Sequence, residues 1–275
     1  MLANLDNEVY FKKVFTDVAV FKAFVKDVLG IEMHIDKVET EKMLPSKVSP
    51  IKFRMDLFAE DIQNRTIVEI QKVDYDYTYD RFTHYFTSNL ADVQRNSRTY
   101  AYAREVYMIV VVTSAYRIKD KEGKLIKDDI LITDINPRTV GGEVREMYNH
   151  KLVILNTTNS TAETPPAIGD WLKLITESKN NPGNPQINTQ KPAIVRAAQL
   201  AETDNIAPEE IADAKIEEMR KEAVAYIKID TTKEVKEEGI KKALKRGKLT
   251  IEEIAEDFDA TIEYVQQVEK ELKNQ

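Results

Sequence analysis

Three residues with oxygen-bearing side chains lie on two neighbouring stretches that have the pattern of β-strands. Asp56 lies in the alternating stretch IKFRMDLFAE (51–60), and Glu69 and Gln71 lie in TIVEIQ (66–71). Side chains alternate between the two faces of a strand, so Glu69 and Gln71 share one face. Two carboxylates and an amide, with no cysteine or histidine beside them, are typical of a site for a hard divalent cation, which prefers oxygen ligands.

The register of the predicted hairpin decides whether Asp56 and Glu69 meet. If residues 61–64 form the turn, Glu60 pairs with Arg65 and Asp56 lies directly opposite Glu69. Opposed β-carbons lie about 5 Å apart, where like charges repel each other. A bound cation would remove this repulsion, lower the pKa of a water and offset charge on a phosphate. The alternative is a pair of solvated acids on an exposed sheet face.

Apolar spacing and capping residues predict the elements that hold this pair. Apolar residues recur every three or four positions through the first thirty residues, where Asp17 caps a second helix and Gly30 ends it. The continuous apolar run YMIVVVT (107–113) is typical of a buried central strand. The other predicted elements are an edge strand at 35–42, a long helix at 77–102, strands near 130–133 and 152–155, and a short helix at 171–175. On the first strand, alternation places Ile51, Phe53, Met55, Leu57 and Ala59 on the face opposite to Asp56.

A shift in composition divides the chain. Residues 1–178 are predicted to form the α/β core, 179–192 (KNNPGNPQINTQKP) a linker, and 193–275 a charged helical tail. The tail ends in two predicted helices with a helix–turn–helix layout, which resembles DNA-binding modules, and packing or oligomerisation is the alternative. Within the basic run just upstream, Lys245 and Arg246 are the candidate phosphate contacts of the tail.

Composition excludes several classes of protein. The net charge of −7 argues against a protein that coats nucleic acid, although a local basic patch can still steer a polyanion. The chain has no cysteine, which excludes disulfides and thiolate metal sites and fits a reducing cytoplasm. No stretch approaches the roughly 18 apolar residues of a membrane span, and the first residues lack the pattern of a signal peptide. A cytoplasmic protein without a membrane partner is therefore expected.

The order and spacing of five motifs resemble the PD-(D/E)xK nuclease superfamily, and more closely its transposase-associated, recombination-promoting branch. Residues 6–180 carry the resemblance, through EVYFKKVF (8–15), Met55-Asp56-Leu57, Val68-Glu69-Ile70-Gln71, YDRFTHY (79–85) and Trp171-Leu172. This resemblance implies a restriction-endonuclease-like mixed β-sheet flanked by helices, followed by a C-terminal helical extension. It also implies a magnesium-dependent DNA endonuclease associated with mobile elements or recombination.

The resemblance assigns roles to residues of this chain. Glu8, Asp56 and Glu69 would bind Mg²⁺ or Mn²⁺, with the Ile70 carbonyl as a further ligand. Gln71 would position water or phosphate, while Arg81, Tyr85 and Lys12 would contact DNA; for Tyr85, a place in the core is the alternative. A homodimer is expected, because one site per chain cuts both strands of a duplex most easily in a symmetric pair.

Position 71 departs from the pattern of the superfamily. The superfamily has lysine where this chain has Gln71, so the cation that would assist water or phosphate is missing there. Lys72 points to the opposite face of the strand, whereas Lys12 or Lys13 of the first helix could reach the site. The alternative function is therefore a catalytically weak or inactive DNA-binding or regulatory protein that keeps the nuclease fold.

Overall fold

The computed structural model describes residues 1–43, 54–72, 79–94, 98–114, 119–246, 249–258 and 260–273. The predicted first strand is thus described from Arg54 onward, and Ile51 and Phe53 lie outside the described residues. The chain forms two compact units, Met1–Lys215 and Ile216–Gln275.

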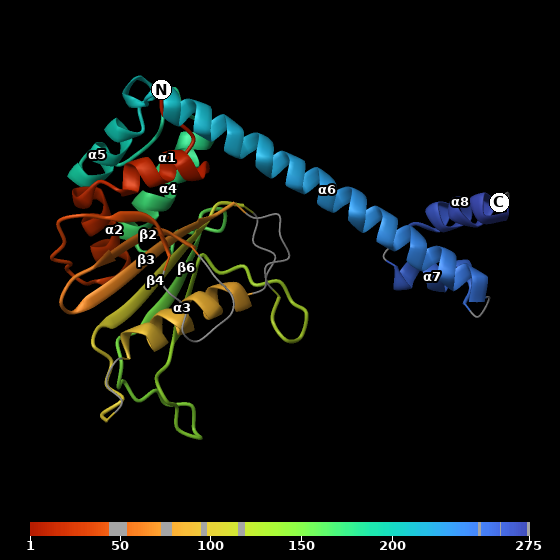
Figure 1. Cartoon of the computed structure of the whole chain (residues 1–275), viewed down its shortest axis with the longest axis horizontal. Coiled ribbons are helices and arrows are strands. Elements are labelled where there is room, and N and C mark those ends of the chain that lie inside the picture. Colours follow the sequence, from red (N-terminus) through yellow and green to blue (C-terminus); the bar gives the residue numbers. More distant parts are fainter. Residues whose placement is uncertain are drawn as a thin grey trace. The chain divides into compact units, whose positions relative to one another are not determined.

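The first unit is built on a mixed sheet. Its described strands form a six-stranded sheet in the order β1-β2-β3-β4-β6-β5 (Figure 1). β3 and β4 are parallel, as are β4 and β6, whereas β1, β2 and β5 join the sheet through antiparallel pairs. This confirms a mixed α/β fold. The strands are β1 (Glu39–Met43), β2 (Arg54–Glu60), β3 (Asn64–Gln71), β4 (Glu105–Val112), β5 (Ile130–Asp134) and β6 (Lys151–Asn156).

The hairpin of β2 and β3 has the predicted register. Leu57 pairs with Val68 and Glu60 with Arg65, and the Asp61 N–H donates to the Asn64 carbonyl (2.9 Å) across the turn. Asp61 also accepts from the amides of Gln63 and Asn64, which fixes a short turn. The strand β3 starts two residues earlier than predicted because the turn is this tight.

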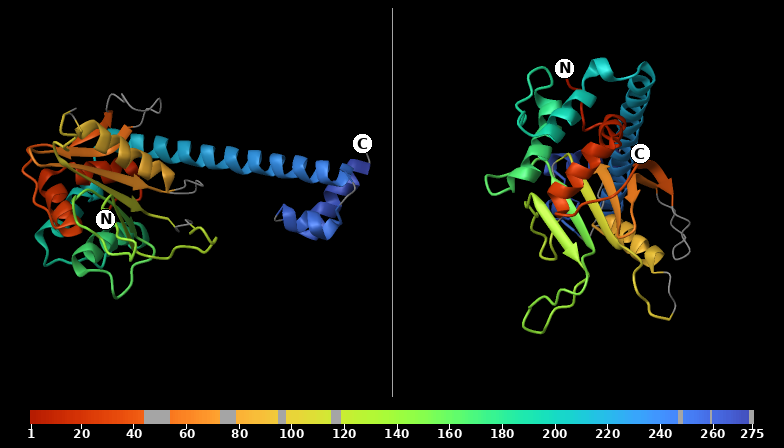
Figure 2. Two further views of the ribbon diagram at one scale, coloured as in Figure 1. Left: turned by 90° about the horizontal axis from the view of Figure 1, so that it is seen from below. Right: turned by 90° about the vertical axis from the view of Figure 1, so that its left-hand side faces the viewer.

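Helices cover both faces of the sheet (Figures 1 and 2). α1 (Glu8–Phe15), α2 (Val18–Leu29), α4 (Pro166–Asn180) and α5 (Pro192–Leu200) pack on one face, where Trp171 is fully buried. α3 (Asp80–Val93) packs on the other face, as the crossover between the parallel strands β3 and β4. Apolar residues of the central strands point to both layers, which explains the unbroken apolar run of β4.

Caps set both ends of α2 as the sequence predicts. The Asp17 carboxylate accepts from the amides of Ala19 and Val20 and so begins α2. Gly30 ends that helix with φ 73°, a left-handed conformation that favours glycine.

The prediction of a helix over 77–102 was wrong at its C-terminal end, because α3 stops at Val93. Its buried face runs through Phe82, Tyr85, Phe86, Asn89, Leu90 and Val93. Continued at the same spacing, the sequence offers only asparagine and serine at positions 96 and 97, which have no apolar side chain to bury. Residues 77 and 78 lie outside the described part of the chain.

The first unit extends past the predicted linker at 179–192. Residues 181–191 and α5 belong to it, because α5 buries Ile194 and Ala197 in the core and Arg196 bonds Asp17 (2.5 and 2.8 Å). The amide of Ala3 also donates to the Ala201 carbonyl (2.7 Å), which ties the chain start to this segment. A 3₁₀ turn (Thr203–Asn205) then leads to α6 (Pro208–Arg246), which begins in this unit.

The second unit contains the predicted pair of helices, α7 (Ile251–Asp257) and α8 (Ile262–Lys273). Thr250 and Glu253 form the predicted capping box (2.7 and 3.2 Å), and the Thr261 hydroxyl accepts from the Tyr264 amide (3.2 Å). The apolar face packs within the unit, through Ile240, Ile254, Ala255, Val265 and Val268. Lys245 and Arg246 are exposed at the end of α6.

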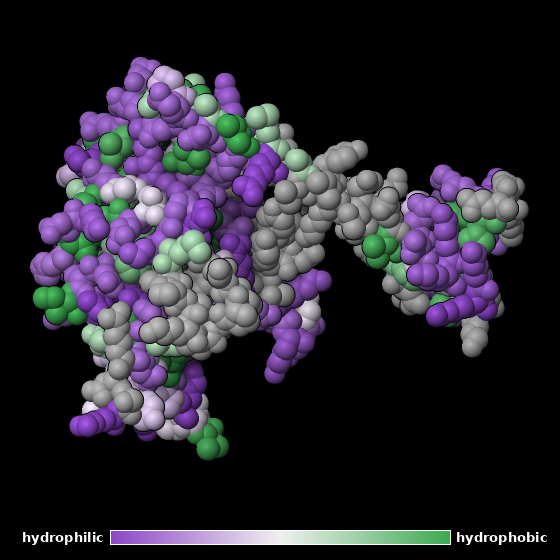
Figure 3. Space-filling model, viewed as in Figure 1, coloured by the Kyte–Doolittle hydropathy of each residue, from purple (hydrophilic) through white to green (hydrophobic). Residues whose placement is uncertain are grey.

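The visible surface of the first unit is mainly hydrophilic, and hydrophobic residues are scattered over it (Figure 3). Scattered apolar residues are ordinary on a protein surface. Within the described part of the chain, no helix combines the length and the apolar character that a membrane span requires.

Candidate metal centre

Asp56 and Glu69 meet where the paired segment of β2 and β3 ends. The Asp56 amide donates to Oε1 of Glu69, and the Ile70 amide donates to Oδ2 of Asp56, both at 3.0 Å. Each carboxylate thus accepts a hydrogen bond from a backbone amide of the opposite strand. Both carboxylates are fixed in place by this exchange rather than pointing freely into solvent.

The alternation of β2 changes at Asp56, and the predicted face of Met55 was wrong. Met55 packs with α3, where Asn89 Nδ2 lies 3.7 Å from its sulfur, whereas Leu57 packs on the opposite face. Two residues two positions apart share a face in a regular strand, so the strand is irregular at Asp56. On the edge strand β1, Thr40 pairs with Leu57 and Lys42 with Met55, which places Glu41 across from Asp56.

Glu41 has a left-handed backbone (φ 56°), which is uncommon for a glutamate. The irregularities of β1 and β2 therefore lie opposite each other. Strained backbone is frequent at functional sites, where surrounding contacts hold it. Here it accompanies a carboxylate that lies against those of Glu8 and Asp56.

Helix α1 supplies the third side of the site. The Asn7 side chain caps it by accepting from the Val9 amide (3.0 Å), and Asn7 itself donates to the Ala214 carbonyl (3.1 Å). Glu8 and Lys12 are one turn apart and therefore project from one side of the helix. The other side buries Phe11, Val14 and Phe15 in the core, which fixes the rotation of α1.

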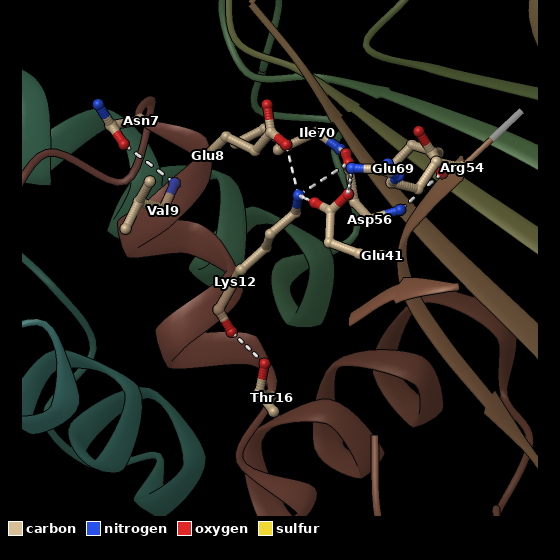
Figure 4. A network of polar contacts seen from close by, with 10 residues as sticks. All are labelled: Asn7, Glu8, Val9, Lys12, Thr16, Glu41, Arg54, Asp56, Glu69 and Ile70. Carbon is tan, nitrogen blue, oxygen red and sulfur yellow. Dashed lines mark hydrogen bonds and ion pairs between the residues drawn. The ribbon is translucent and has the colours of Figure 1, made fainter. Parts of the chain in front are cut away.

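The carboxylates of Glu8, Glu41 and Asp56 converge on the ammonium of Lys12 (Figure 4). We call these three carboxylates the acidic cluster. One oxygen from each lies within 4.8 Å of the others, and Lys12 Nζ bonds Glu8 and Glu41 and lies 3.3 Å from Asp56 Oδ1. The side chains of Lys12 and Asp56 are only 13% and 14% exposed, so solvent screens this contact weakly. The cluster is thus a position already suited to a cation.

Burial and mutual repulsion shift the pKa values of the acids upward. Burial, followed by repulsion from Glu8, raises the pKa of Asp56 to about 6, although Lys12 opposes the shift. Burial and the neighbouring Asp56 raise the pKa of Glu69 well above its usual range. For Lys12, burial lowers the pKa, but Asp56, Glu41 and Glu8 outweigh it and leave the pKa raised. The nearby positive charge is therefore too small to stabilise both ionised carboxylates fully, while the Lys12 ammonium stays protonated.

The raised pKa of Asp56 predicts that its contribution to the stability of the metal-free protein falls as pH rises. The pKa of Asp56 is about 6 when folded and near 3.8 in an unfolded chain, so the native state binds the proton more tightly. Its contribution is present below pH 4 and is lost as pH rises through about 6. In EDTA, we expect Asp56→Asn to lose less thermal stability than the wild type between pH 4.5 and pH 7, measured by circular dichroism. Parallel curves for the two proteins would contradict this prediction.

Gln71, Arg81 and Tyr85 form a second chain of contacts beside the cluster. Arg81 Nη1 donates to Gln71 Oε1 (2.9 Å) and Arg81 Nε donates to the Tyr85 hydroxyl (3.1 Å). The Tyr85 ring is buried in the core between α3 and the sheet, which is the alternative to a DNA contact given for this residue. Lys72 points to the face opposite to that of Gln71, where its ammonium lies 3.3 Å from the buried carboxylate of Asp6.

The structure thus brings together most of the predicted site residues. Asp56, Glu69, Glu8, Lys12 and Ile70 meet at one place, and Gln71 adjoins it through the contacts of Arg81. Lys245 and Arg246 belong to the second unit.

Glu41 belongs to the acidic cluster but was not predicted as a site residue. The feature that would have indicated Glu41 is the register of β1 on β2, which places Glu41 opposite Asp56. That register could not be read from the sequence, because the connection between β1 and β2 has no turn motif of fixed length.

Comparison of the chain with protein-family models, with curated proteins and with solved structures finds no match.

Proposed function

We propose that this chain is a metal-dependent DNA endonuclease of the PD-(D/E)xK type, with a restriction-endonuclease-like core. One observation carries the proposal: carboxylates from α1, β1 and β2 converge on a single cation beside the paired Asp56 and Glu69. The sequence motifs imply Glu8, Asp56 and Glu69 as the metal ligands of a nuclease. The converging set shares Glu8 and Asp56 with them and has Glu41 as its third member, while Glu69 accepts a hydrogen bond from the Asp56 amide.

The donor set fits a hard divalent cation such as Mg²⁺ or Mn²⁺. Glu8, Glu41 and Asp56 offer oxygen atoms close enough to share one ion. The Ile70 N–H points toward β2, and the carbonyl of a strand residue points the same way as its N–H. The Ile70 carbonyl oxygen would therefore be a further metal ligand. When bound, the cation would supply charge against the reacting phosphate and acidify a water.

The chain's own residues would position the reactants. Because Arg81 binds the amide oxygen of Gln71, the amide nitrogen of Gln71 is left to donate to water or to a phosphate oxygen. The Arg81 guanidinium brings positive charge to the same side, and Arg54 is exposed beside Glu41. These cations would offset the net charge of −7 where a polyanion must approach.

A role with mobile elements or recombination, and a homodimer that cuts both strands, follow from the same resemblance. The second candidate function, a DNA-binding protein with weak or no activity, is favoured by Gln71. This residue holds the position of the superfamily lysine but carries no charge, and its amide oxygen is already bound by Arg81.

Cleavage of supercoiled plasmid tests the proposal. We expect nicked and then linear DNA when purified protein is incubated with Mg²⁺ or Mn²⁺, and none when EDTA removes the metal. Equal cleavage in EDTA would exclude metal dependence. A gel shift of the same DNA without cleavage in either metal would replace the proposal with the DNA-binding alternative.

A further inference from the structure

Lys12 is the cation that the acidic cluster holds in this structure. Its ammonium bonds Glu8 and Glu41, lies 3.3 Å from Asp56, and is largely shielded from solvent. Its backbone carbonyl accepts from the hydroxyl of Thr16, and helix α1 is capped and anchored in the core. The base of this side chain is therefore fixed, while its stem of four carbons remains flexible.

An ammonium and a divalent cation cannot use the same oxygens at the same time. The oxygens of the cluster lie within 4.8 Å of one another, so they surround one position. Magnesium would need them at about 2.0–2.1 Å, closer than the ammonium allows a second cation to come. A divalent cation entering this position must therefore displace Lys12.

The exchange is favoured by charge. Three carboxylates and one ammonium carry a net charge of −2, and Arg54, which also pairs with Glu41, is 62% exposed and therefore screened. A divalent cation reduces the remaining charge, and the freed ammonium stays on the same turn of α1. It would then lie beside any phosphate bound at the site and supply the positive charge that Gln71 lacks.

We propose that Lys12 is an exchangeable counter-ion: it holds the acidic cluster in the metal-free protein and is released by a divalent cation to contact the phosphate. The inference rests on the proposed function and deepens it. A purely structural Lys12, which only joins α1 to β1 and β2, makes the opposite prediction for metal affinity.

Binding of Mn²⁺ to DNA-free protein separates the two roles. If Lys12 competes with the metal, Lys12→Met will bind Mn²⁺ about tenfold more tightly or better, measured by titration calorimetry, because one close positive charge has been removed. The same variant will nick plasmid more slowly at saturating Mn²⁺. Lys13→Met is the matched control, because Lys13 pairs with Glu210 (2.6 Å) outside the cluster, and its Mn²⁺ affinity should stay unchanged. Unchanged or weaker Mn²⁺ binding by Lys12→Met would overturn the proposal.

A measurement on the wild type covers the case in which Lys12→Met does not fold. Acetylation by an excess of an amine-reactive ester, followed by mass spectrometry, reports how accessible each lysine is. We expect Lys12 to react slowly in EDTA and several times faster with saturating Mn²⁺, while the rate at Lys13 does not change. Equal or slower labelling of Lys12 with Mn²⁺ would overturn the exchange. If the protein cuts DNA but Lys12 is labelled no faster with Mn²⁺, only the inference fails. If the protein binds no Mn²⁺, the proposed function fails as well.

Discussion

Asp56→Asn is expected to reduce metal-dependent nicking of plasmid by roughly 100-fold or more. Asp56 belongs to the acidic cluster and also contacts β3, through the Ile70 amide (3.0 Å). A bound metal contributes several kcal/mol of transition-state stabilisation, and each 1.36 kcal/mol corresponds to a factor of about ten in rate. Losing a central ligand should forfeit much of this stabilisation.

Asparagine is the informative replacement, because it keeps the shape of the side chain and an oxygen for the Ile70 amide. The fold should therefore persist, which circular dichroism verifies, while the charge is lost. Glu39→Gln is the matched control: it removes one carboxylate from the neighbouring strand β1, where Glu39 pairs with Lys42 (2.9 Å) outside the cluster. Initial rates at saturating Mg²⁺ give the comparison. A rate for Asp56→Asn within about threefold of the control would remove Asp56 from the site.

The parts of the fold that follow local rules could be predicted from the sequence. The turn at residues 61–64 sets the register of the hairpin, and the structure pairs Leu57 with Val68 accordingly. Caps at Asp17, Gly30 and Thr250 mark helix ends, because each satisfies backbone groups within a few residues. These features need no knowledge of distant segments.

The parts that depend on distant segments could not be predicted. Met55 faces α3 rather than the layer of Leu57, because β2 is irregular opposite the left-handed Glu41. The sequence of β2 alone shows a regular alternation and carries no sign of this change. Glu8 and Lys12 lie one turn apart on α1 and so project from one side of it, but only tertiary packing shows that this side meets Asp56.

The site therefore depends on the core that holds α1 in place, and Trp171 is the residue that tests this dependence. The tryptophan is fully buried, with its ring centroid 5.7 Å from that of Phe15 on α1 and 5.4 Å from that of Phe24 on α2. Its indole N–H donates to Asp27 (2.6 Å). We expect Trp171→Ala to lower the free energy of unfolding by about 3–5 kcal/mol, because it leaves a large cavity among these rings.

Urea denaturation followed by circular dichroism measures this loss, since the chain has a single tryptophan and the variant loses its fluorescence. Trp171→Phe separates packing from hydrogen bonding: it keeps an aromatic ring and should cost less than the alanine variant, with about 1–3 kcal/mol due to the lost hydrogen bond to the Asp27 carboxylate, which keeps Lys191 as a partner (2.8 Å). Because Phe15 and Lys12 are less than one turn apart on α1, the cavity should also weaken binding of Mn²⁺ in urea-free buffer. A Trp171→Ala protein of near wild-type stability would show that the core between α1, α2 and α4 does not hold the site. A destabilised protein with unchanged Mn²⁺ affinity would show that α1 keeps its position through its cap and its contacts with the strands alone.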